Sequence, residues 1–442
     1  MKKIKNRAYF ALLIALALVA GTIVYIIRLW NDGGDWVMLR ANRSVFSNGV
    51  LDVGEVTDRN GVILARAGDG VYAYAEDEAV RRACLHAVGD YEGNIGAGAL
   101  NVYAKRLAGY SFWNGTNSID GKGKKLALTI DSRAQVMACN SALDRGAIMV
   151  MNYETGEVLC MMSAPSFDPA VGYDSETDSA DGVYINRCLN TAYVPGSVFK
   201  IVTLAAAIEN IEDLDERRFP CAGSVIVGGE LITCTDSHGE QTIEEAFANS
   251  CNCAFSELTQ QLGGEILNKY AKDLGLIEPL EVGGVGTAGG RYDLWSEGSG
   301  SLSWSGIGQS TDMVTPVAML RLCAAIAAGG TVTEPRLLMS QAEKKTQLLS
   351  EETAAKLREM MNYNVVYAYE GASPLITIDG VTMYAKTGTA EVGDGTSHAW
   401  FVGFIDEETQ PLAFVVISEN AGSGLAFAAP KAHAVLTTLL GG

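Results

Sequence analysis

The sequence lacks several signatures of familiar enzyme and binding sites. Its four histidines show no metal-ligand spacing, and Cys251 and Cys253 form no Cys-x-x-Cys pair, so we expect no zinc site and no other metal. There is no Gly-x-Ser-x-Gly elbow. Basic residues are few: 33 Lys and Arg stand against 52 Asp and Glu, a formal net charge of −19. That balance argues against a nucleic-acid-binding protein.

One nucleotide-binding motif is matched by its residue pattern but lacks the expected structural context. Gly284-x-Gly286-x-x-Gly289 matches a dinucleotide fingerprint, but Arg291 and a Gly/Ser-rich stretch follow it rather than a helix. We therefore interpret it as a loop and expect no cofactor. A Ser-His-Asp triad stays open from sequence, although nothing calls for one.

The number and surroundings of the cysteines predict buried thiols rather than a disulfide framework. Nine are present, an odd number, and too many for a chain that must avoid mispairing in an oxidising compartment. Most lie in apolar surroundings and are expected to be small buried hydrophobic residues. Cys221 and Cys234 flank a predicted hairpin over 224–232 and can face each other, so a bridge between them stays open.

The chain is long and apolar enough for more than one folded unit. It has 442 residues, of which 48% are hydrophobic and 19% charged, values typical of globular proteins. Residues 1–7 are basic, and residues 8–30 form an apolar run of about 23 residues, long enough to span a bilayer. An uncleaved anchor is favoured over a signal peptide cleaved after Ala20. The positive-inside rule then predicts a single-pass cell-membrane protein with residues 1–7 in the cytoplasm and the remainder outside.

The segment 31–124 predicts a small β-rich N-terminal domain that serves as a pedestal. Its clearest element is a hairpin over 54–65, with Asn60-Gly61 at the tip of the turn. Residues 115–125 are rich in turn formers and are expected to be a linker. No catalytic grouping is visible there.

Residues 125–442 predict a second, larger domain. Helices are expected at 131–143 (capped by Asp131 or Ser132), 197–209, 242–262, 315–328, 351–362 and 430–440. Strands are expected at 147–152, 158–163, 380–386, 398–405 and 412–418. Strands at both ends with helices between them indicate an α/β (α+β) fold with a mostly antiparallel sheet.

A turn that leads into a helix carries the first candidate catalytic pair. Pro195-Gly196 precedes Ser197, and Lys200 lies three residues further on, on the same helical face. A neutral lysine can activate a serine hydroxyl when burial and nearby cations lower its pKa. Taken alone, Ser197 is better explained as a helix cap followed by a surface lysine.

Two further motifs supply partners for Ser197. In Ser250-Cys251-Asn252, the Ser250 hydroxyl can relay a proton and the Asn252 amide can bind a substrate carbonyl. In the strand-ending Lys386-Thr387-Gly388-Thr389, Lys386 offers positive charge that depresses the pKa of Lys200, and the two threonine hydroxyls can bind a carboxylate. Gly388 allows close approach of a substrate backbone. The N–H groups of Ser197 and Thr389 are candidate oxyanion donors. A second Ser-x-Asn at 418–420 has no helical setting and indicates nothing by itself.

The order Ser-x-x-Lys, Ser-x-Asn, Lys-Thr-Gly is the signature of penicillin-binding proteins and serine β-lactamases. Over most of its length the sequence resembles the class B penicillin-binding proteins, membrane-anchored peptidoglycan D,D-transpeptidases, and it is most similar to the short PbpA type. Further blocks carry the resemblance: 57–61, 156–159 with 164–169, Asn186-Arg187, 306–309 with 315–316, 386–391 and 399–403.

The resemblance implies a transpeptidase domain with a five-stranded antiparallel sheet flanked by helices. It also implies that a D-Ala-D-Ala stem peptide acylates Ser197, that the acyl group passes to an amine of a second stem, and that β-lactams inhibit covalently. No glycosyltransferase domain precedes the transpeptidase, so glycan polymerisation is expected from a partner of the SEDS family. The role in elongation, division or sporulation stays open, as do the acceptor amine and the oligomeric state.

Two rival interpretations remain. The first is a β-lactamase or D,D-carboxypeptidase of the same fold, although no Glu-x-x-Leu-Asn segment lies between Ser250 and Lys386. The second is a non-catalytic scaffold in a wall-assembly complex, although every motif residue is present.

Overall fold

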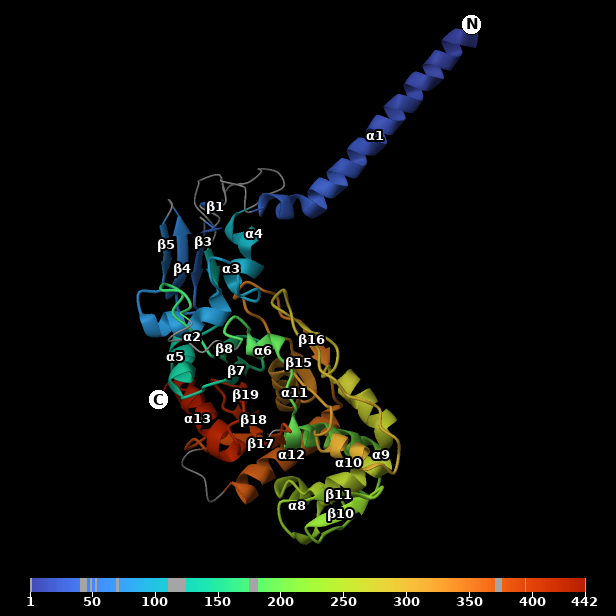
Figure 1. Cartoon of the computed structure of the whole chain (residues 1–442), viewed down its shortest axis with the longest axis vertical. Helices are drawn as coiled ribbons and strands as arrows, with labels where there is room; N and C mark the ends of the chain where they lie inside the picture. The colour runs from blue at the N-terminus through green and yellow to red at the C-terminus, as the bar shows by residue number, and fades with distance from the viewer. Residues whose placement is uncertain are drawn as a thin grey trace.

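The computed structural model describes residues 2–39, 46–47, 50–51, 54–68, 71–109, 125–174, 182–369, 376–393 and 395–441. The chain begins with one long helix, α1 (Lys2–Val37), which projects from the rest of the molecule in Figure 1. By length and composition, residues 3–37 of this helix could cross a membrane, and none of their most apolar window is buried in the protein. The predicted apolar run 8–30 therefore lies within a single exposed helix.

A four-stranded sheet follows, in the order β5-β4-β3-β6. The strands are β3 (Gly54–Thr57), β4 (Ile63–Gly68), β5 (Val71–Tyr74) and β6 (Lys125–Ala127). β3 and β4 pair antiparallel across a turn, which confirms the predicted hairpin. β6 pairs parallel to β3, so this N-terminal sheet is closed by residues just after the predicted domain boundary at 124. The predicted linker lies outside the described residues except for Lys125.

Buried Asp58 joins the N-terminal sheet to the larger part of the chain. Its carboxylate accepts hydrogen bonds from the backbone N–H groups of Asn60 and Val62 in the hairpin turn. The same carboxylate accepts bonds from the N–H and hydroxyl of Ser132 at the start of α5 (Ser132–Asn140). The buried carboxyl group thus accepts hydrogen bonds from four donors in two segments, which compensates for its burial. Asp131 caps α5, as predicted.

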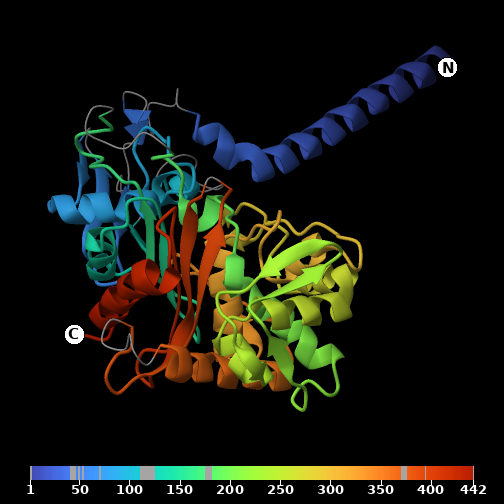
Figure 2. The ribbon, with the colours of Figure 1, turned by 60° about the horizontal axis from the view of Figure 1, so that its bottom comes forward.

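The central sheet has five strands in the order β17-β18-β19-β7-β8, and every pairing is antiparallel. The fold class predicted from sequence is therefore confirmed. The strands are β7 (Gly146–Asn152), β8 (Val158–Ala164), β17 (Thr382–Glu391), β18 (Ser397–Asp406) and β19 (Leu412–Ser418). In Figure 2 the C-terminal strands stand beside the green and yellow helical part of the chain.

Side chains on the two faces of the sheet pack into two separate cores. Ile148 and Val150 of β7 belong to a core with α5 and the last helix, α13 (Ala429–Leu439). Met149 and Met151 point to the other face, into a larger core with α7 (Lys200–Asn210) and α11 (Pro316–Ala327). Because both faces are covered by helices, β7, β8 and β19 are apolar almost throughout rather than alternating.

The remaining elements complete the helical part and its small hairpins. The helices are α2 (Glu78–Val88), α3 (Ala99–Val102), α4 (Ala104–Leu107), α6 (Arg187–Asn190), α8 (Ile243–Ala248), α9 (Asn252–Asp273), α10 (Gly300–Gly306) and α12 (Glu351–Ala368), with η1 (Gly196–Phe199) and η3 (Gly424–Ala428). The short strands are β1 (Phe46–Ser47), β2 (Val50–Leu51), β9 (Phe219–Cys221), β10 (Ser224–Val227), β11 (Glu230–Thr233), β12 (Gly239–Gln241), β13 (Glu281–Val282), β14 (Val285–Gly286), β15 (Thr331–Thr333) and β16 (Lys345–Gln347).

Three of the boundaries predicted from sequence differ from those in the structure. The helix expected over 242–262 is two helices, α8 and α9, because Ser250 adopts a left-handed φ of 52°, which no helix continues through. The strand expected over 380–386 extends to Glu391 as β17, so the Lys-Thr-Gly motif lies inside the strand rather than at its end. A helix was also predicted to end at 362, whereas α12 continues to Ala368.

Candidate active site

Ser197 lies in η1, a single 3₁₀ turn that leads directly into α7. Pro195 and Gly196 form the entry to this turn, as predicted, and Gly196 has a left-handed φ of 56°. Lys200 is the first residue of α7, so it sits one turn beyond Ser197. Within the described part of the chain, the Ser197 hydroxyl makes no hydrogen bond, which leaves it available to a substrate.

Three glycines allow the backbone segments around Ser197 to touch. The Gly196 N–H donates to the Gly308 carbonyl at 2.7 Å. A Cβ atom at Gly308, whose φ is +80°, would lie 2.2 Å from the carbonyl oxygen of Gly196. A Cβ atom at Gly388 would lie 3.1 Å from both the Pro195 carbonyl oxygen and the side chain of Val198. Gly388 thus serves the packing of β17 against η1, a role that the sequence interpretation, which assigned it to substrate approach, did not include.

The Lys200 amine is fully buried and connects two of the predicted motifs. It donates hydrogen bonds to the Ser250 carbonyl (2.5 Å), the Ser250 hydroxyl (3.1 Å) and the Asn252 side-chain carbonyl (2.7 Å). Its ammonium lies 5.4 Å from the centre of the Phe255 ring. Burial lowers the pKa of Lys200 to about 8, and nearby cysteine sulfur atoms oppose that shift. A lysine with this pKa is neutral in about one molecule in ten at pH 7 and in about half of the molecules at pH 8.

Lys386 is the second buried lysine of the site. Burial, and then the charge of Lys200, lower the pKa of Lys386 well below its usual range. Burial is also the first cause of the lowered pKa of Lys200. Two buried amines therefore share one site, and a charge on either one disfavours a charge on the other. That a charged Lys386 holds Lys200 neutral stays a prediction.

The backbone break at Ser250 places the Ser-x-Asn motif. The left-handed Ser250 ends α8, and Asn252 begins α9. Ser250 and Asn252 can therefore both reach the Lys200 amine from opposite ends of this short break. The Asn252 side-chain NH₂ donates to the Thr233 carbonyl at 2.8 Å, which fixes the orientation of its amide.

The free edge of β17 faces Ser197. Thr387 donates its backbone N–H to the Tyr369 hydroxyl at 2.8 Å, outside the sheet, and Tyr369 in turn bonds the Thr387 hydroxyl at 3.0 Å. N–H groups of alternate residues in a strand point to the same edge. The Thr389 N–H therefore points away from β18, toward η1. Tyr369 was not singled out from sequence, because a tyrosine at a helix end carries no distinguishing pattern.

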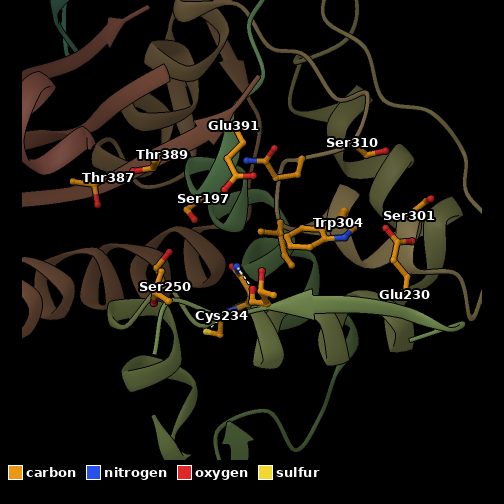
Figure 3. Close-up of a pocket in the computed structure, with 15 residues that line it drawn as sticks. Ser197, Glu230, Cys234, Ser250, Ser301, Trp304, Ser310, Thr387, Thr389 and Glu391 are labelled. Carbon is orange, nitrogen blue, oxygen red and sulfur yellow. Dashed lines mark hydrogen bonds between the residues drawn. The ribbon is translucent and has the colours of Figure 1, made fainter. Parts of the chain in front are cut away.

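A cavity of about 570 Å³ is lined by residues from all three motifs. In Figure 3, Ser197 lies between Ser250 on one side and Thr387 and Thr389 on the other. Asn252 also lines the cavity. Sequence reasoning gave no site role to the other lining residues. Ile307, Gln309 and Glu391 lie in blocks that carried the family resemblance. The remaining residues come from loops and short elements without a motif: Glu230, Thr233, Cys234, Thr235, Ser301, Trp304 and Ser310.

Two patterns that were set aside in the sequence prove structural. Glu419, within the second Ser-x-Asn, accepts hydrogen bonds from Arg187 (2.8 Å) and Tyr193 (2.8 Å), so it ties β19 to the segment before η1. The glycine pattern over 284–289 overlaps the β13–β14 hairpin and no helix follows it, which agrees with its interpretation as a loop.

Comparison with known proteins identifies the class of this site. The family model of the penicillin binding protein transpeptidase domain matches residues 146–437. The chain belongs to this family. Among solved structures it is similar to penicillin-binding protein A from Mycobacterium tuberculosis as a ceftriaxone acyl-enzyme complex, at 26% identity and a TM-score of 0.72, covering 88% of this chain and 98% of that one. The D,D-transpeptidase domain from Eggerthella lenta gives 26% identity and a TM-score of 0.73, with 88% and 98% covered.

Curated relatives point to the class B branch. The chain is 29% identical over 393 residues to peptidoglycan D,D-transpeptidase PbpA of Mycobacterium tuberculosis, covering 78% of each protein. It is 32% identical over 353 residues to stage V sporulation protein D of Bacillus subtilis, covering 72% of this chain and 53% of that protein. The resemblance predicted from the motifs is confirmed.

Proposed function

We propose that this protein is a peptidoglycan D,D-transpeptidase that cross-links stem peptides through an acyl-enzyme on Ser197. The observation that carries the proposal is the convergence of three sequence-distant motifs on one cavity, with the buried Lys200 amine bonded to both residues of the Ser-x-Asn motif. The relatives that are named D,D-transpeptidases support the same reaction.

In the acylation step, neutral Lys200 removes the proton from the Ser197 hydroxyl. The Ser197 oxygen attacks the carbonyl carbon of the penultimate D-Ala, and the N–H groups of Ser197 and Thr389 stabilise the oxyanion. The C–N bond to the terminal D-Ala then breaks. Ser250, which hydrogen-bonds Lys200, relays the proton to the departing amine. The products are an ester on Ser197 and free D-Ala.

In the transfer step, an amine of a second stem peptide attacks the ester. The C–O bond to Ser197 breaks, an amide forms, and the proton lost by the amine returns to the Ser197 oxygen. Asn252 binds the donor amide, and Thr387 and Thr389 bind its terminal carboxylate. Gly388 keeps β17 close enough to η1 for these contacts. A carboxylate beside Lys386 favours its charged form, so we expect ligand binding to add a proton there.

The terminal carboxylate and the amide of D-Ala-D-Ala are also features of β-lactams. A penicillin would therefore acylate Ser197 by ring opening, which leaves no departing group to make room for an acceptor amine. Structures of a relative as β-lactam acyl-enzymes support this expectation.

The arrangement along the chain suggests how the enzyme is placed. We propose that α1 anchors the protein in the cell membrane with residues 1–7 in the cytoplasm, that 31–124 is a pedestal, and that the transpeptidase domain (125–442) works outside the membrane. A glycan polymerase of the SEDS family would supply its substrate strands. These assignments rest on the charge and apolar pattern of the N-terminus and on the family resemblance.

Labelling by a fluorescent penicillin tests the proposal. The full chain in detergent should be labelled stoichiometrically, and the Ser197→Ala variant should not. Rapid loss of the label by hydrolysis would indicate a β-lactamase, and release of D-Ala without cross-linked product would indicate a carboxypeptidase. Absence of labelling in the wild type would indicate a non-catalytic scaffold. Each of these three results would overturn the transpeptidase assignment.

A further inference from the structure

Four cysteines far apart in the sequence meet beside the Ser-x-Asn motif. Cys221 ends β9, Cys234 directly follows β11, and Cys251 and Cys253 lie at the start of α9. Their four Sγ atoms all lie within 4.8 Å of one another. Three of the four residues are buried, and Cys234 is half-buried at the cavity wall. We name this group the four-cysteine cluster.

The spacing of the sulfur atoms fits a metal better than a disulfide. A disulfide needs an S–S distance of about 2.0 Å, whereas Cys234 Sγ and Cys251 Sγ are 3.9 Å apart. Tetrahedral Zn²⁺ with Zn–S bonds of about 2.3 Å places its sulfur ligands about 3.8 Å apart. All nine cysteines are free thiols in the structure. The structure forms no bridge between Cys221 and Cys234, which the sequence left open, and both residues belong to the four-cysteine cluster.

The surroundings favour thiolate ligands. The backbone N–H of Asn252 donates to Cys234 Sγ at 3.2 Å, and such a bond stabilises negative charge on sulfur. Cys251 is the N-cap residue of α9 and Cys253 lies in its first turn, where the helix dipole favours anions. His238 Nδ1 lies 3.6 Å from Cys234 Sγ, which places a second polar group around the same ligand.

We infer that the four-cysteine cluster binds one Zn²⁺ ion as a structural site that positions the Ser-x-Asn motif. The ion replaces the four thiol protons, which pass to solvent, and leaves a Zn(Cys)₄ group of net charge −2. Spacing along the sequence did not reveal this site, because Cys251 and Cys253 are two apart and their partners come from a separate hairpin. The sequence expectation of no metal considered only local pairs.

The cluster acts on the catalytic groups through the backbone. Cys251 separates Ser250 from Asn252, and Cys234 adjoins Thr233, whose carbonyl accepts a bond from the Asn252 amide. An ion held by these cysteines would fix the left-handed turn at Ser250 to the β10–β11 hairpin. The cluster does not touch the reacting atoms, so its cysteines are positioning residues. Their effect on acylation rests on the proposed function, whereas zinc binding does not.

Zinc content tests the inference without any assay of activity. The full chain, purified in detergent with no added metal or chelator, should contain one zinc ion per chain when its metal content is measured by inductively coupled plasma mass spectrometry. Cys221→Ser and Cys253→Ser should lose it, whereas Cys139→Ser, a half-buried cysteine outside the cluster, should retain it. Cys221→His should also retain it, since imidazole is a zinc ligand, and this variant separates loss of the ion from loss of the fold. Cobalt substitution should give the thiolate charge-transfer absorption of a tetrahedral sulfur site.

Two results would overturn the inference. A metal-free protein whose intact mass is about 4 Da low would show two disulfides, and a metal-free protein with four alkylatable cluster thiols would show no site. Removal of zinc by a chelator should slow penicillin acylation about 10-fold, as loss of supporting groups around a site commonly does. The Ser197→Ala variant should keep its zinc, so failure of the proposed chemistry and failure of the zinc site give different results.

Discussion

Lys200 and Lys386 define the site at the scale of single residues. Both amines are buried, and both have lowered pKa values because burial penalises the charged form. Two adjacent buried amines cannot both be charged at low cost. The state that suits acylation has a neutral Lys200 beside Ser197, and the state that suits ligand binding has a charged Lys386 beside a carboxylate.

The pH dependence of acylation follows from the pKa of Lys200. A general base must be unprotonated, so the rate should be low below the pKa, rise with pH through it, and level off above it. The midpoint should lie near 8, the pKa to which burial lowers Lys200. The measurement is the second-order rate constant for penicillin acylation from pH 6 to pH 9.5. A rate that is flat or falls over this range would exclude Lys200 as the base.

Substitution of the two lysines should separate chemistry from binding. Lys200→Ala should reduce acylation about 1,000-fold, because the loss of a general base costs about 10²–10⁴, while reversible binding of the ligand persists. Lys386→Ala should weaken reversible binding of carboxylate-bearing ligands about 10-fold or more, a loss of at least about 1.4 kcal/mol. Stopped-flow kinetics resolve the two constants. Equal affinity in Lys386→Ala would argue against its carboxylate role, and unchanged acylation in Lys200→Ala would refute the base.

At the scale of elements, the site depends on the contact between η1, β17 and the loop after α10. These three backbones approach closely at glycines, and the edge of β17 presents the Thr389 N–H to η1. The Ser-x-Asn break between α8 and α9 completes the arrangement from the opposite side. Elements that no local motif marks, such as the end of α12 with Tyr369, hold this arrangement in place.

Gly308→Ala should damage this contact, whereas Gly329→Ala should not. Both glycines have left-handed φ values, +80° and +68°, so alanine costs each about 1 kcal/mol in backbone conformation. At Gly308 the new Cβ would also lie 2.2 Å from the Gly196 carbonyl oxygen, whereas nothing lies within 4 Å at Gly329. Denaturant unfolding and penicillin labelling should show a loss of about 3 kcal/mol or more and impaired acylation in Gly308→Ala alone. Equal effects of the two substitutions would contradict the close-approach account.

The sequence predicted elements well where periodicity or a turn signal was strong. The β3–β4 hairpin, the strands β7, β8 and β19, and the capped helices α5 and α11 follow from alternation, apolar runs and cap residues. It failed at Ser250, because a left-handed serine is stabilised by tertiary contacts such as its bonds to Lys200 and has no local signal. It also ended β17 too early, because the polar Lys-Thr-Gly residues interrupt the apolar pattern of a strand that is buried by η1.

The candidate site was predictable to a similar degree. Each of the three motifs contributes residues to one cavity, so their order along the chain was sufficient to group them. Three features of the site could be seen only in the structure. They are the cause of the lowered lysine pKa values, the packing role of Gly388 and the contribution of Tyr369. The four-cysteine cluster depended most on the coordinates. Its cysteines come from separate segments of the sequence and meet only because the β9–β12 segment packs against the start of α9.

At the scale of the whole molecule, one long apolar helix precedes a folded body whose central sheet contributes to two cores. The N-terminal sheet is joined to the transpeptidase part through Asp58 and through β6, so the two parts share one of these cores. In the proposed topology, the pedestal over 31–124 would hold the cavity beside Ser197 near the membrane.

The anchor leads to a prediction about topology. The full chain should remain with the membrane after washing with high salt and with alkaline carbonate, since burial of an apolar helix is insensitive to both. Protease added outside intact spheroplasts should degrade the chain beyond about residue 38 and leave a fragment that contains α1. Protection of the catalytic domain from that protease would contradict the proposed orientation, and release by carbonate would contradict the anchor.

The central claim is that Ser197 is the nucleophile of a transpeptidase site. Intact-mass analysis of the full chain after penicillin treatment, followed by peptide mapping of the adduct, tests it most directly. The account predicts one penicilloyl group per chain, on the peptide that contains Ser197, and none on the Ser197→Ala variant. An adduct on another residue, or an unmodified wild-type chain with intact fold, would contradict it.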